Sequence, residues 1–353
     1  MESHQVSLRK LVEYFDNVVS VVGFCLNLTL LYLIIYKTSF RLRDYRPILL
    51  QNCLIDIFFN IINTMTKTQV DQKNGNFYMY MIGPLENITA PYNNLLICLW
   101  VFSLFYCLTG VPVQFVYRYI LIVRASKVTF VHYFSLLISA LLAALIYALW
   151  TVYTFLHNEP RWKKASVLLQ EDPNYSEGLP NFVVASIDEW PLRILFIYAY
   201  FLVCVVYIIT IFSSTKVWRH LKSMENQMTV QVQDAHRQIT VTLFFQAIIP
   251  CVVSLIPIIT AVTMAFIHGN VPGLGLILAL LYTAIPIVNP LLTLIVVRNY
   301  RRNAIYMIEK ICGKRNTRVE PTTAPMTHQG VMSKTSQGAP QGTSSMDFIE
   351  QFA

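Results

Sequence analysis

Seven long apolar runs, separated by shorter polar segments, dominate this sequence of 353 residues. An α-helix needs about 20 apolar residues to cross about 30 Å of membrane hydrocarbon. Only 13% of the residues are charged, whereas soluble domains carry about a quarter. We therefore predict an all-α membrane protein with a seven-transmembrane-helix bundle. Spans one to seven are assigned to residues 14–36, 47–65, 91–123, 131–156, 192–214, 238–266 and 271–297.

Basic residues concentrate on one side of the predicted bundle. Segments 37–46, 118–130, 215–237 and 298–353 contain 19 Lys and Arg residues, whereas 1–13, 66–90, 157–191 and 267–270 contain seven. Cytosolic loops of membrane proteins carry the excess of Lys and Arg, so the first set is predicted to be cytosolic and the N-terminus extracellular. The formal net charge of +8 then faces anionic lipid head groups, and no nucleic-acid partner is needed to explain it.

Three segments flank the bundle, which occupies residues 14–297. Residues 1–13 are predicted to form an extracellular N-terminus. In residues 298–312, basic and apolar positions alternate at helical spacing, which predicts an amphipathic juxtamembrane helix on the inner leaflet of the lipid bilayer. Residues 313–353 are rich in Thr, Ser, Pro, Gly and Gln and are predicted to be a disordered cytosolic tail. Cys312 is either a palmitoylation site or an unmodified thiol.

Two acceptor sequences for N-linked glycans fall in the predicted outer loops. They are Asn87-Ile-Thr and Asn174-Tyr-Ser, and both agree with an extracellular position for these loops. The same loops contain no cysteine, since six of the seven cysteines lie inside apolar runs. Such cysteines are small packing residues, so we predict no structural disulfide.

Three polar residues are expected at one depth of the membrane. At 1.5 Å of rise per residue, Asn27 in span one and Asp56 in span two both lie about 13 Å from the cytosolic end of their helices. Asn289 in span seven lies about 12 Å from its cytosolic end. A buried carboxylate needs partners, so these residues are predicted to form a polar core that shares hydrogen bonds, a water or a sodium ion. The alternative is three unrelated polar residues with separate neighbours.

Arg118 stands at the inner end of span three, in the segment PVQFVYRYILIVR. An arginine at this depth can extend to the membrane interface with its charge in water. It can also donate hydrogen bonds to the backbone carbonyls at the end of a docked partner helix. The residues alone leave both interpretations open.

A transporter or ligand-gated channel is one class of protein that such a bundle could form. Such proteins carry several intramembrane charges along the substrate path, whereas this chain has Asp56 and little else at depth. All seven histidines lie in loops, tails or span ends, so no catalytic or metal-binding cluster is expected and the chain is not predicted to be an enzyme. No cofactor is predicted, and span seven has no lysine for a retinal Schiff base.

Several segments together resemble a known receptor family. They are LLYLIIYKTSFRLRDYRPILLQNCLID, PVQFVYRYILIVR, QDAHRQIT with FFQAIIP, and NPLLTLIVVRNYRR. With seven spans and the Asn27, Asp56 and Asn289 positions, the chain is similar to rhodopsin-like G-protein-coupled receptors. More narrowly, residues 14–305 resemble the nematode serpentine chemoreceptors of class delta (Srd) or the related Str type.

The resemblance implies a plasma-membrane chemosensory receptor, located in sensory-neuron cilia, that binds an odorant or pheromone-like small molecule. It also implies a heterotrimeric G protein as partner. The residues placed at this coupling surface are Tyr117, Arg118, Tyr119, Lys216, Arg219 and Lys222. Two departures bear on the activation switch, because Tyr117 replaces the acid that precedes this arginine in the family and Thr293 stands where the family has tyrosine.

By the same resemblance, the ligand pocket lies between the outer halves of spans three, five, six and seven. Its predicted lining residues are Asn93, Asn94, Tyr198, Thr260, Thr263 and Tyr282. Many aromatic residues occupy this half of the bundle, which favours a small, mostly apolar ligand held by few hydrogen bonds. Helix–helix packing and an interfacial aromatic belt are the alternative roles for each of these residues.

Overall fold

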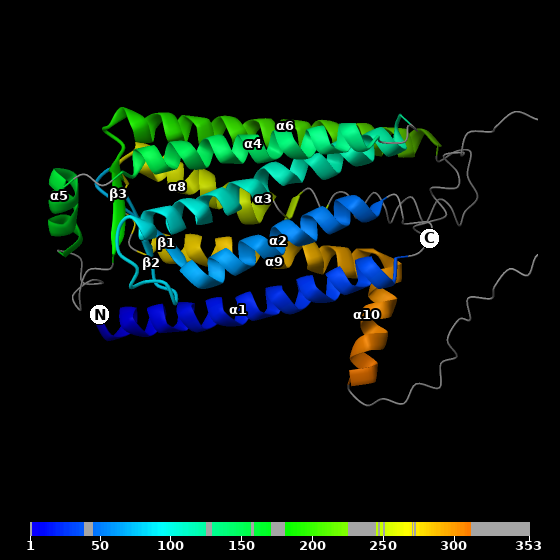
Figure 1. Ribbon diagram of the computed structural model, residues 1–353, viewed down its shortest axis with the longest axis horizontal. Helices are drawn as coiled ribbons and strands as arrows, with labels where there is room; N and C mark the ends of the chain where they lie inside the picture. The colour runs from blue at the N-terminus through cyan, green and yellow to red at the C-terminus, as the bar shows by residue number, and fades with distance from the viewer. Residues whose placement is uncertain are drawn as a thin grey trace, which may run out of the picture.

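A computed structural model of the protein describes residues 2–38, 45–124, 129–156, 159–170, 181–224, 245, 248–249, 251–269, 271 and 273–311. Long helices run side by side, and three strands with helix α5 lie across one end of the bundle (Figure 1). The helical elements are α1 (Glu2–Tyr36), α2 (Arg46–Thr66), α3 (Tyr92–Ile122), α4 (Phe130–Thr154), α5 (Glu159–Gln170), α6 (Trp190–Met224), the π-helical turn η4 (Cys251–Leu255), α8 (Ile256–Phe266), α9 (Leu274–Val296) and α10 (Arg298–Ile311). The strands are β1 (Thr68–Lys73), β2 (Asn76–Met81) and β3 (Phe182–Ser186).

Six of the described helices are long and apolar enough to cross a membrane. Their apolar portions are Tyr14–Tyr36, Arg46–Thr66, Tyr92–Ile122, Val131–Thr154, Trp190–His220 and Ile277–Val296. They coincide with predicted spans one to five and seven, with the largest differences at the end of span five and the start of span seven. Predicted span six, residues 238–266, is described mainly in its second half, where η4 and α8 follow one another. Helix α1 begins at Glu2, so it includes most of the predicted N-terminal segment.

Helix α3 lies at the centre of the bundle. It packs against α2, α4 and α6, and 67% of its most apolar stretch is buried. Helix α6, by contrast, exposes Ile197, Phe201, Ile208 and Phe212. These residues recur at intervals of four and seven, so they share one helical face. In a membrane-spanning bundle such an apolar face meets lipid.

The sheet at one end of the bundle joins the segment between α2 and α3 to the segment between α5 and α6. Strand β2 pairs antiparallel with both neighbours, so that Asn76 lies opposite Lys73 in β1 and opposite Ser186 in β3. The turn residues Asn74 and Gly75 have positive φ angles of 50° and 76°, which the Asn-Gly pair adopts readily in two-residue hairpin turns. The prediction of a helical bundle therefore holds for the spans, and the sheet is an addition to it.

At the opposite end, α10 runs across the direction of the bundle (Figure 1). The hydroxyl groups of Tyr300 and Thr38 share a hydrogen bond of 2.9 Å. The Asn299 side chain donates to the backbone oxygen of Lys37, also at 2.9 Å. These contacts hold α10 against the end of α1. The predicted juxtamembrane helix corresponds to α10, whereas Cys312 and the tail lie outside the described residues.

Candidate functional site

The intramembrane acid Asp56 is buried where α1, α2 and α9 meet. The Asn289 side-chain nitrogen donates to both carboxylate oxygens of Asp56, at 3.2 and 3.1 Å. The Asn27 side chain donates instead to the backbone oxygens of Gly23 (2.9 Å) and Pro286 (2.7 Å). The structure therefore brings the three predicted polar-core residues into one region. Asn27, however, joins α1 to the α9 backbone rather than to the Asp56 side chain.

A small polar cavity lies beside this cluster. Its volume is about 10 Å³, close to the space that one water molecule needs. Its lining residues are Leu30, Leu49, Asn52, Cys53, Asp56, Gln114, Arg118, Asn289, Leu292 and Thr293. The Asn52 amide donates to Gln114 Oε1 at 2.8 Å, which links α2 to α3 across the cavity. The polar core thus reaches the helix that carries Arg118.

Arg118 lies inside the bundle and lines this polar cavity. The residue is only 9% exposed, which argues against a side chain extended to the membrane interface. The Tyr117 ring packs edge-on against Tyr133 of α4, with ring centres 5.7 Å apart. The Tyr119 ring lies 6.3 Å from that of Phe212 in α6. The two tyrosines therefore fix the end of α3 against its neighbours, while Arg118 faces the polar cavity.

The basic residues predicted to contact a G protein lie on a helix rather than in a loop. They are Lys216, Arg219 and Lys222, and all three are exposed. Helix α6 continues to Met224, well beyond the predicted end of span five. The Lys222 ammonium group lies 5.2 Å from the centre of the Trp218 ring. The rest of the predicted loop, residues 225–237, lies outside the described residues.

At the sheet end of the bundle, a mostly apolar cavity of about 50 Å³ lies between α3, α4, α6, α8 and α9. We call it the apolar cavity. Its lining residues are Val70, Phe77, Met79, Trp100, Val101, Leu104, Phe105, Tyr147, Thr151, Phe155, Leu195, Phe196, Ile258, Ala261, Val262 and Tyr282. The Trp100 and Tyr282 rings meet edge to face, with centres 5.6 Å apart. Strands β1 and β2 also contribute lining residues. This is the region in which the ligand pocket was predicted.

The six predicted ligand-binding residues do not share one cavity. Tyr282 lines the apolar cavity. The Tyr198 hydroxyl donates to a backbone oxygen of α4 at 3.3 Å, and Thr260 is half-buried on α8. Thr263 is exposed and shares a hydrogen bond with the hydroxyl of Tyr200. Hydropathy predicts where each helix lies along the chain but not how it is rotated, and these placements depend on rotation.

Asn93 and Asn94 line a second, larger cavity that is bounded on one side by strand β3, which we call the outer cavity. Its volume is about 180 Å³. Its lining residues are Thr89, Ala90, Asn93, Asn94, Phe155, Leu156, Trp162, Asn181, Phe182, Val183 and Val184. The Asn94 amide lies 3.5 Å from the backbone oxygen of Phe155. Phe155 contributes to the walls of both cavities.

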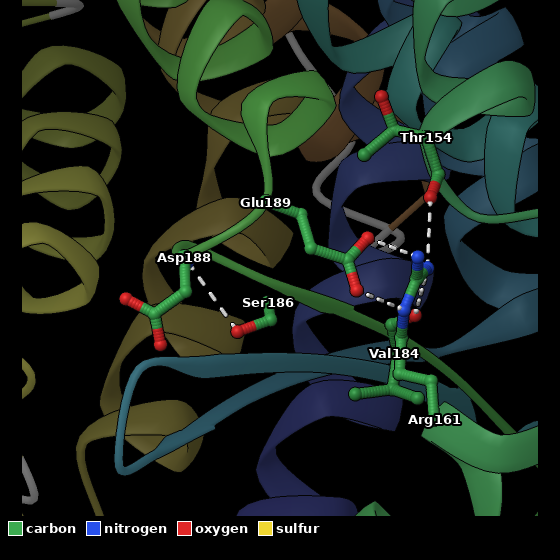
Figure 2. Close-up of polar contacts among 6 residues, drawn as sticks. All are labelled: Thr154, Arg161, Val184, Ser186, Asp188 and Glu189. Atoms are coloured by element: carbon green, nitrogen blue, oxygen red, sulfur yellow. Dashed lines mark hydrogen bonds and ion pairs between the residues drawn. The ribbon is translucent and has the colours of Figure 1, made fainter.

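Arg161 connects the elements around the outer cavity. Its Nε donates to Glu189 Oε1 at 2.9 Å, and its Nη2 pairs with Oε2 of the same carboxylate. Its Nη1 lies 3.5 Å from the backbone oxygens of Thr154 and Val184. Figure 2 shows the guanidinium group directed at Glu189, whereas the Asp188 carboxylate points away. One side chain of α5 thereby contacts the end of α4, strand β3 and the start of α6.

A chain of buried hydrogen bonds lies beside the apolar cavity and was not predicted from the sequence. Trp100 Nε1 donates to Asn63 Oδ1 at 2.8 Å, and the Asn63 amide donates to the Thr283 hydroxyl at 3.3 Å. The Thr283 hydroxyl in turn donates to Asp16. Asn63 lies seven residues after Asp56 and therefore on the same face of α2. That spacing is the signal by which it could have been found.

Of the two predicted glycosylation sites, one lies among the described residues. Asn87 lies in the exposed turn between β2 and α3, at the sheet end of the molecule. Asn174 lies outside the described residues. The position of Asn87 leaves its side chain accessible, which an acceptor asparagine requires.

These features define the class of the protein. A central α3, a polar core shared by α1, α2 and α9, and a cavity between the helices at one end belong to the rhodopsin-like fold of seven-helix membrane receptors. The crystal structure of squid rhodopsin is similar, with a TM-score of 0.56 and 13% sequence identity over 87% of each chain. At this identity the similarity concerns the fold alone.

The sequence identifies the family within this class. Residues 12–305 match the family described as serpentine-type seven-transmembrane G-protein-coupled chemoreceptor Str, and the chain belongs to that family. The match confirms the resemblance to serpentine chemoreceptors and selects the Str type. This family and fold are those of multi-pass membrane receptors and not, in general, of enzymes. A search of curated proteins finds no match.

Proposed function

We propose that this protein is a plasma-membrane chemosensory receptor that binds a small external chemical and activates a heterotrimeric G protein. Family membership supports the chemosensory role. The structural observation that carries the proposal is the layout of α3. Near the sheet, Trp100 and Phe105 of this helix form walls of the apolar cavity. Towards its other end, Arg118 lines the polar cavity.

The proposed orientation follows from the charges. Lys and Arg are concentrated in the segments at the α10 end of the bundle, and such segments remain in the cytosol. The sheet and the N-terminus of α1 lie together at the other end (Figure 1), so we place them outside the cell. The family resemblance extends this expectation to the membrane of a sensory-neuron cilium.

The apolar cavity favours a very small ligand. A cavity of about 150 Å³ lined by apolar side chains is enough to bind benzene, and the apolar cavity has about a third of that volume. Its walls contain no Asp, Glu, Lys, Arg or His side chain. We therefore propose an uncharged ligand of a few heavy atoms, held mainly by aromatic side chains such as Trp100, Phe105 and Tyr282.

Helix α8 is the element through which such a ligand could act. Ile258, Ala261 and Val262 of this helix line the apolar cavity. Directly before α8 lies the π-helical turn η4, followed by Pro257 near the start of α8. Pro257 has no backbone N–H to donate, and π-helical turns interrupt the regular hydrogen-bond ladder. We propose this junction as a hinge at which α8 can move relative to the rest of the bundle.

A combined reporter and current recording tests the function. Cells expressing the protein would be exposed to small neutral volatiles while a G-protein reporter and the membrane current are recorded. We expect a reporter signal without a ligand-evoked current. A ligand-evoked current without any reporter signal would instead support a channel.

Two substitutions on α8 test the location of the ligand. Ala261→Phe fills the apolar cavity and is expected to abolish the response to an active volatile. Ile259→Phe adds a similar ring at an exposed position of the same helix and is expected to preserve the response. Equal responses from both variants at equal surface expression would contradict the proposed ligand site.

A further inference from the structure

The outer cavity is separate from the cavity to which the agonist was assigned. It lies between the start of α3, the turn after α4, helix α5 and strand β3. Its volume of about 180 Å³ exceeds that of the apolar cavity more than threefold. Phe155 forms part of the wall between the two. The outer cavity therefore requires an explanation of its own.

Asn93 gives this cavity its most specific chemistry. The residue is 5% exposed and lines the cavity. Its Oδ1 atom is buried and has no hydrogen-bond partner among the described residues. Buried polar side chains in folded proteins are almost always hydrogen-bonded, to protein, to water or to a ligand. An unpartnered amide at a cavity wall is therefore a ready contact for a bound molecule with a hydroxyl or N–H group.

The other residues that line the outer cavity favour a flat, uncharged ligand. The Trp162 and Phe182 rings stack on each other, with an interplanar angle of 9° and centres 5.4 Å apart, and Phe155 adds a third aromatic ring. None of the lining residues is ionisable, so a charged ligand would lose its hydration without a compensating charge. The volume is slightly larger than that of a cavity known to hold benzene. A single substituted ring fits these limits.

The Arg161 contacts keep these walls in place. Arg161 precedes Trp162 in α5 and contacts the backbone of Thr154, which precedes Phe155. It also contacts the backbone of Val184, itself a lining residue. Figure 2 shows these contacts converging on one guanidinium group. The cavity is therefore bounded by elements that are fixed to one another.

We propose that the outer cavity is a second small-molecule site, which binds a neutral ring-sized compound through a hydrogen bond to Asn93. The site goes beyond the proposed function, since it can be occupied whether or not a G protein responds. Its ligand class differs from that of the apolar cavity in size and in the requirement for a hydrogen-bonding group.

Ligand-observed ¹⁹F NMR tests this site with the full chain in lipid nanodiscs. The probes are 4-fluorobenzyl alcohol and 4-fluorotoluene, which share a ring and differ in the hydroxyl group. Empty nanodiscs measure partition into lipid. We expect saturable broadening of the alcohol signal, with affinity about tenfold above that of fluorotoluene, the ratio expected for one hydrogen bond in a buried site.

Variants identify the cavity that is occupied. Asn93→Leu keeps the side-chain size and is expected to weaken alcohol binding about tenfold without affecting fluorotoluene. If this variant fails to fold, Trp162→Ala, which removes one wall, is expected to weaken both probes. Tyr282→Trp fills the apolar cavity and is expected to leave alcohol binding unchanged. Unchanged alcohol binding in Asn93→Leu, or its loss in Tyr282→Trp alone, would overturn the proposal. No G protein is present, so failure here is distinct from failure of signalling.

Discussion

The buried carboxylate of Asp56 is hydrogen-bonded by Asn289. Asn289 donates to both of its carboxylate oxygens, and a polar group buried in a membrane needs such partners. Asn289→Ala removes these hydrogen bonds while Asp56 stays buried. We expect a loss of about 1–3 kcal/mol of stability, seen as a lower thermal midpoint in detergent. Ser139→Ala is the control, because that exposed hydroxyl bonds only within its own helix, and equal midpoints for the two variants would refute the expectation.

Arg118 is the residue on which coupling is expected to depend. Its side chain reaches the polar cavity between α3 and the polar core, so we expect Arg118→Ala to abolish G-protein activation. Arg124→Ala is the matched control, since Arg124 is exposed six residues further along the chain. Reporter assays at equal surface expression compare the two. Normal signalling by Arg118→Ala would remove this residue from the mechanism.

The depth of a single residue in the membrane could be predicted, but the direction in which its side chain points could not. The rise per residue of an α-helix is fixed, so counting from the span ends placed Asp56 and Asn289 at one level. The rotation of each helix depends on packing against its neighbours. For that reason Asn27 bonds the Pro286 backbone rather than Asp56, and Asn93 lines a different cavity from Tyr282.

Among the elements, the sheet has its own pH dependence. Burial, and to a lesser extent the charge of Asp71, raises the pKa of Tyr78 to about 12. An unfolded tyrosine ionises near pH 10, so this contribution to stability is present below pH 10 and is lost as the pH rises towards 12. We expect Tyr78→Phe to lose less stability than the wild type between pH 9 and pH 11, measured by thermal unfolding. Tyr306→Phe, at an exposed site in α10, should behave as the wild type, and identical losses in all three proteins would contradict this.

Helix α5 is held by Arg161, and charge reversal tests this. Arg161→Glu places two carboxylates together and should release α5, seen as faster amide hydrogen exchange across residues 159–170. Combining Arg161→Glu with Glu189→Arg restores opposite charges and should return part of the protection. Lys164→Glu changes the same charge at an exposed position of α5 and should have little effect. Similar exchange in both single variants would show that the Arg161–Glu189 pair does not hold the helix.

The long helices were predictable because membrane spans are read from composition over about 20 residues. The strands were not predicted, because they are short segments within the loops between spans. Asn74-Gly75, a strong hairpin signal, lies between them and was the available clue. The pairing of β2 with β3 joins segments about 100 residues apart, and no local pattern specifies such a contact.

At the scale of the whole molecule, the two ends differ in chemistry. The sheet end carries the two cavities. One is lined mainly by apolar side chains, and the other by asparagine amides and aromatic rings. The α10 end carries exposed basic residues of α6 and α10. Cys25, Cys53, Cys98, Cys107 and Cys204 are free thiols, and at the sheet end the strand pairing and the Arg161–Glu189 pair connect the segments between the helices. The proposed function needs this asymmetry, because it places the ligand and the G protein on opposite sides of the membrane.

Orientation in the membrane is therefore the property on which both proposed sites depend. Different epitope tags would be placed at the two ends of the chain, and antibody staining compared between intact and permeabilised cells. The N-terminal tag should stain on intact cells, and the C-terminal tag only after permeabilisation. Staining of the C-terminal tag on intact cells would place Arg118 and the basic end of α6 outside the cell, which contradicts coupling to a cytosolic G protein.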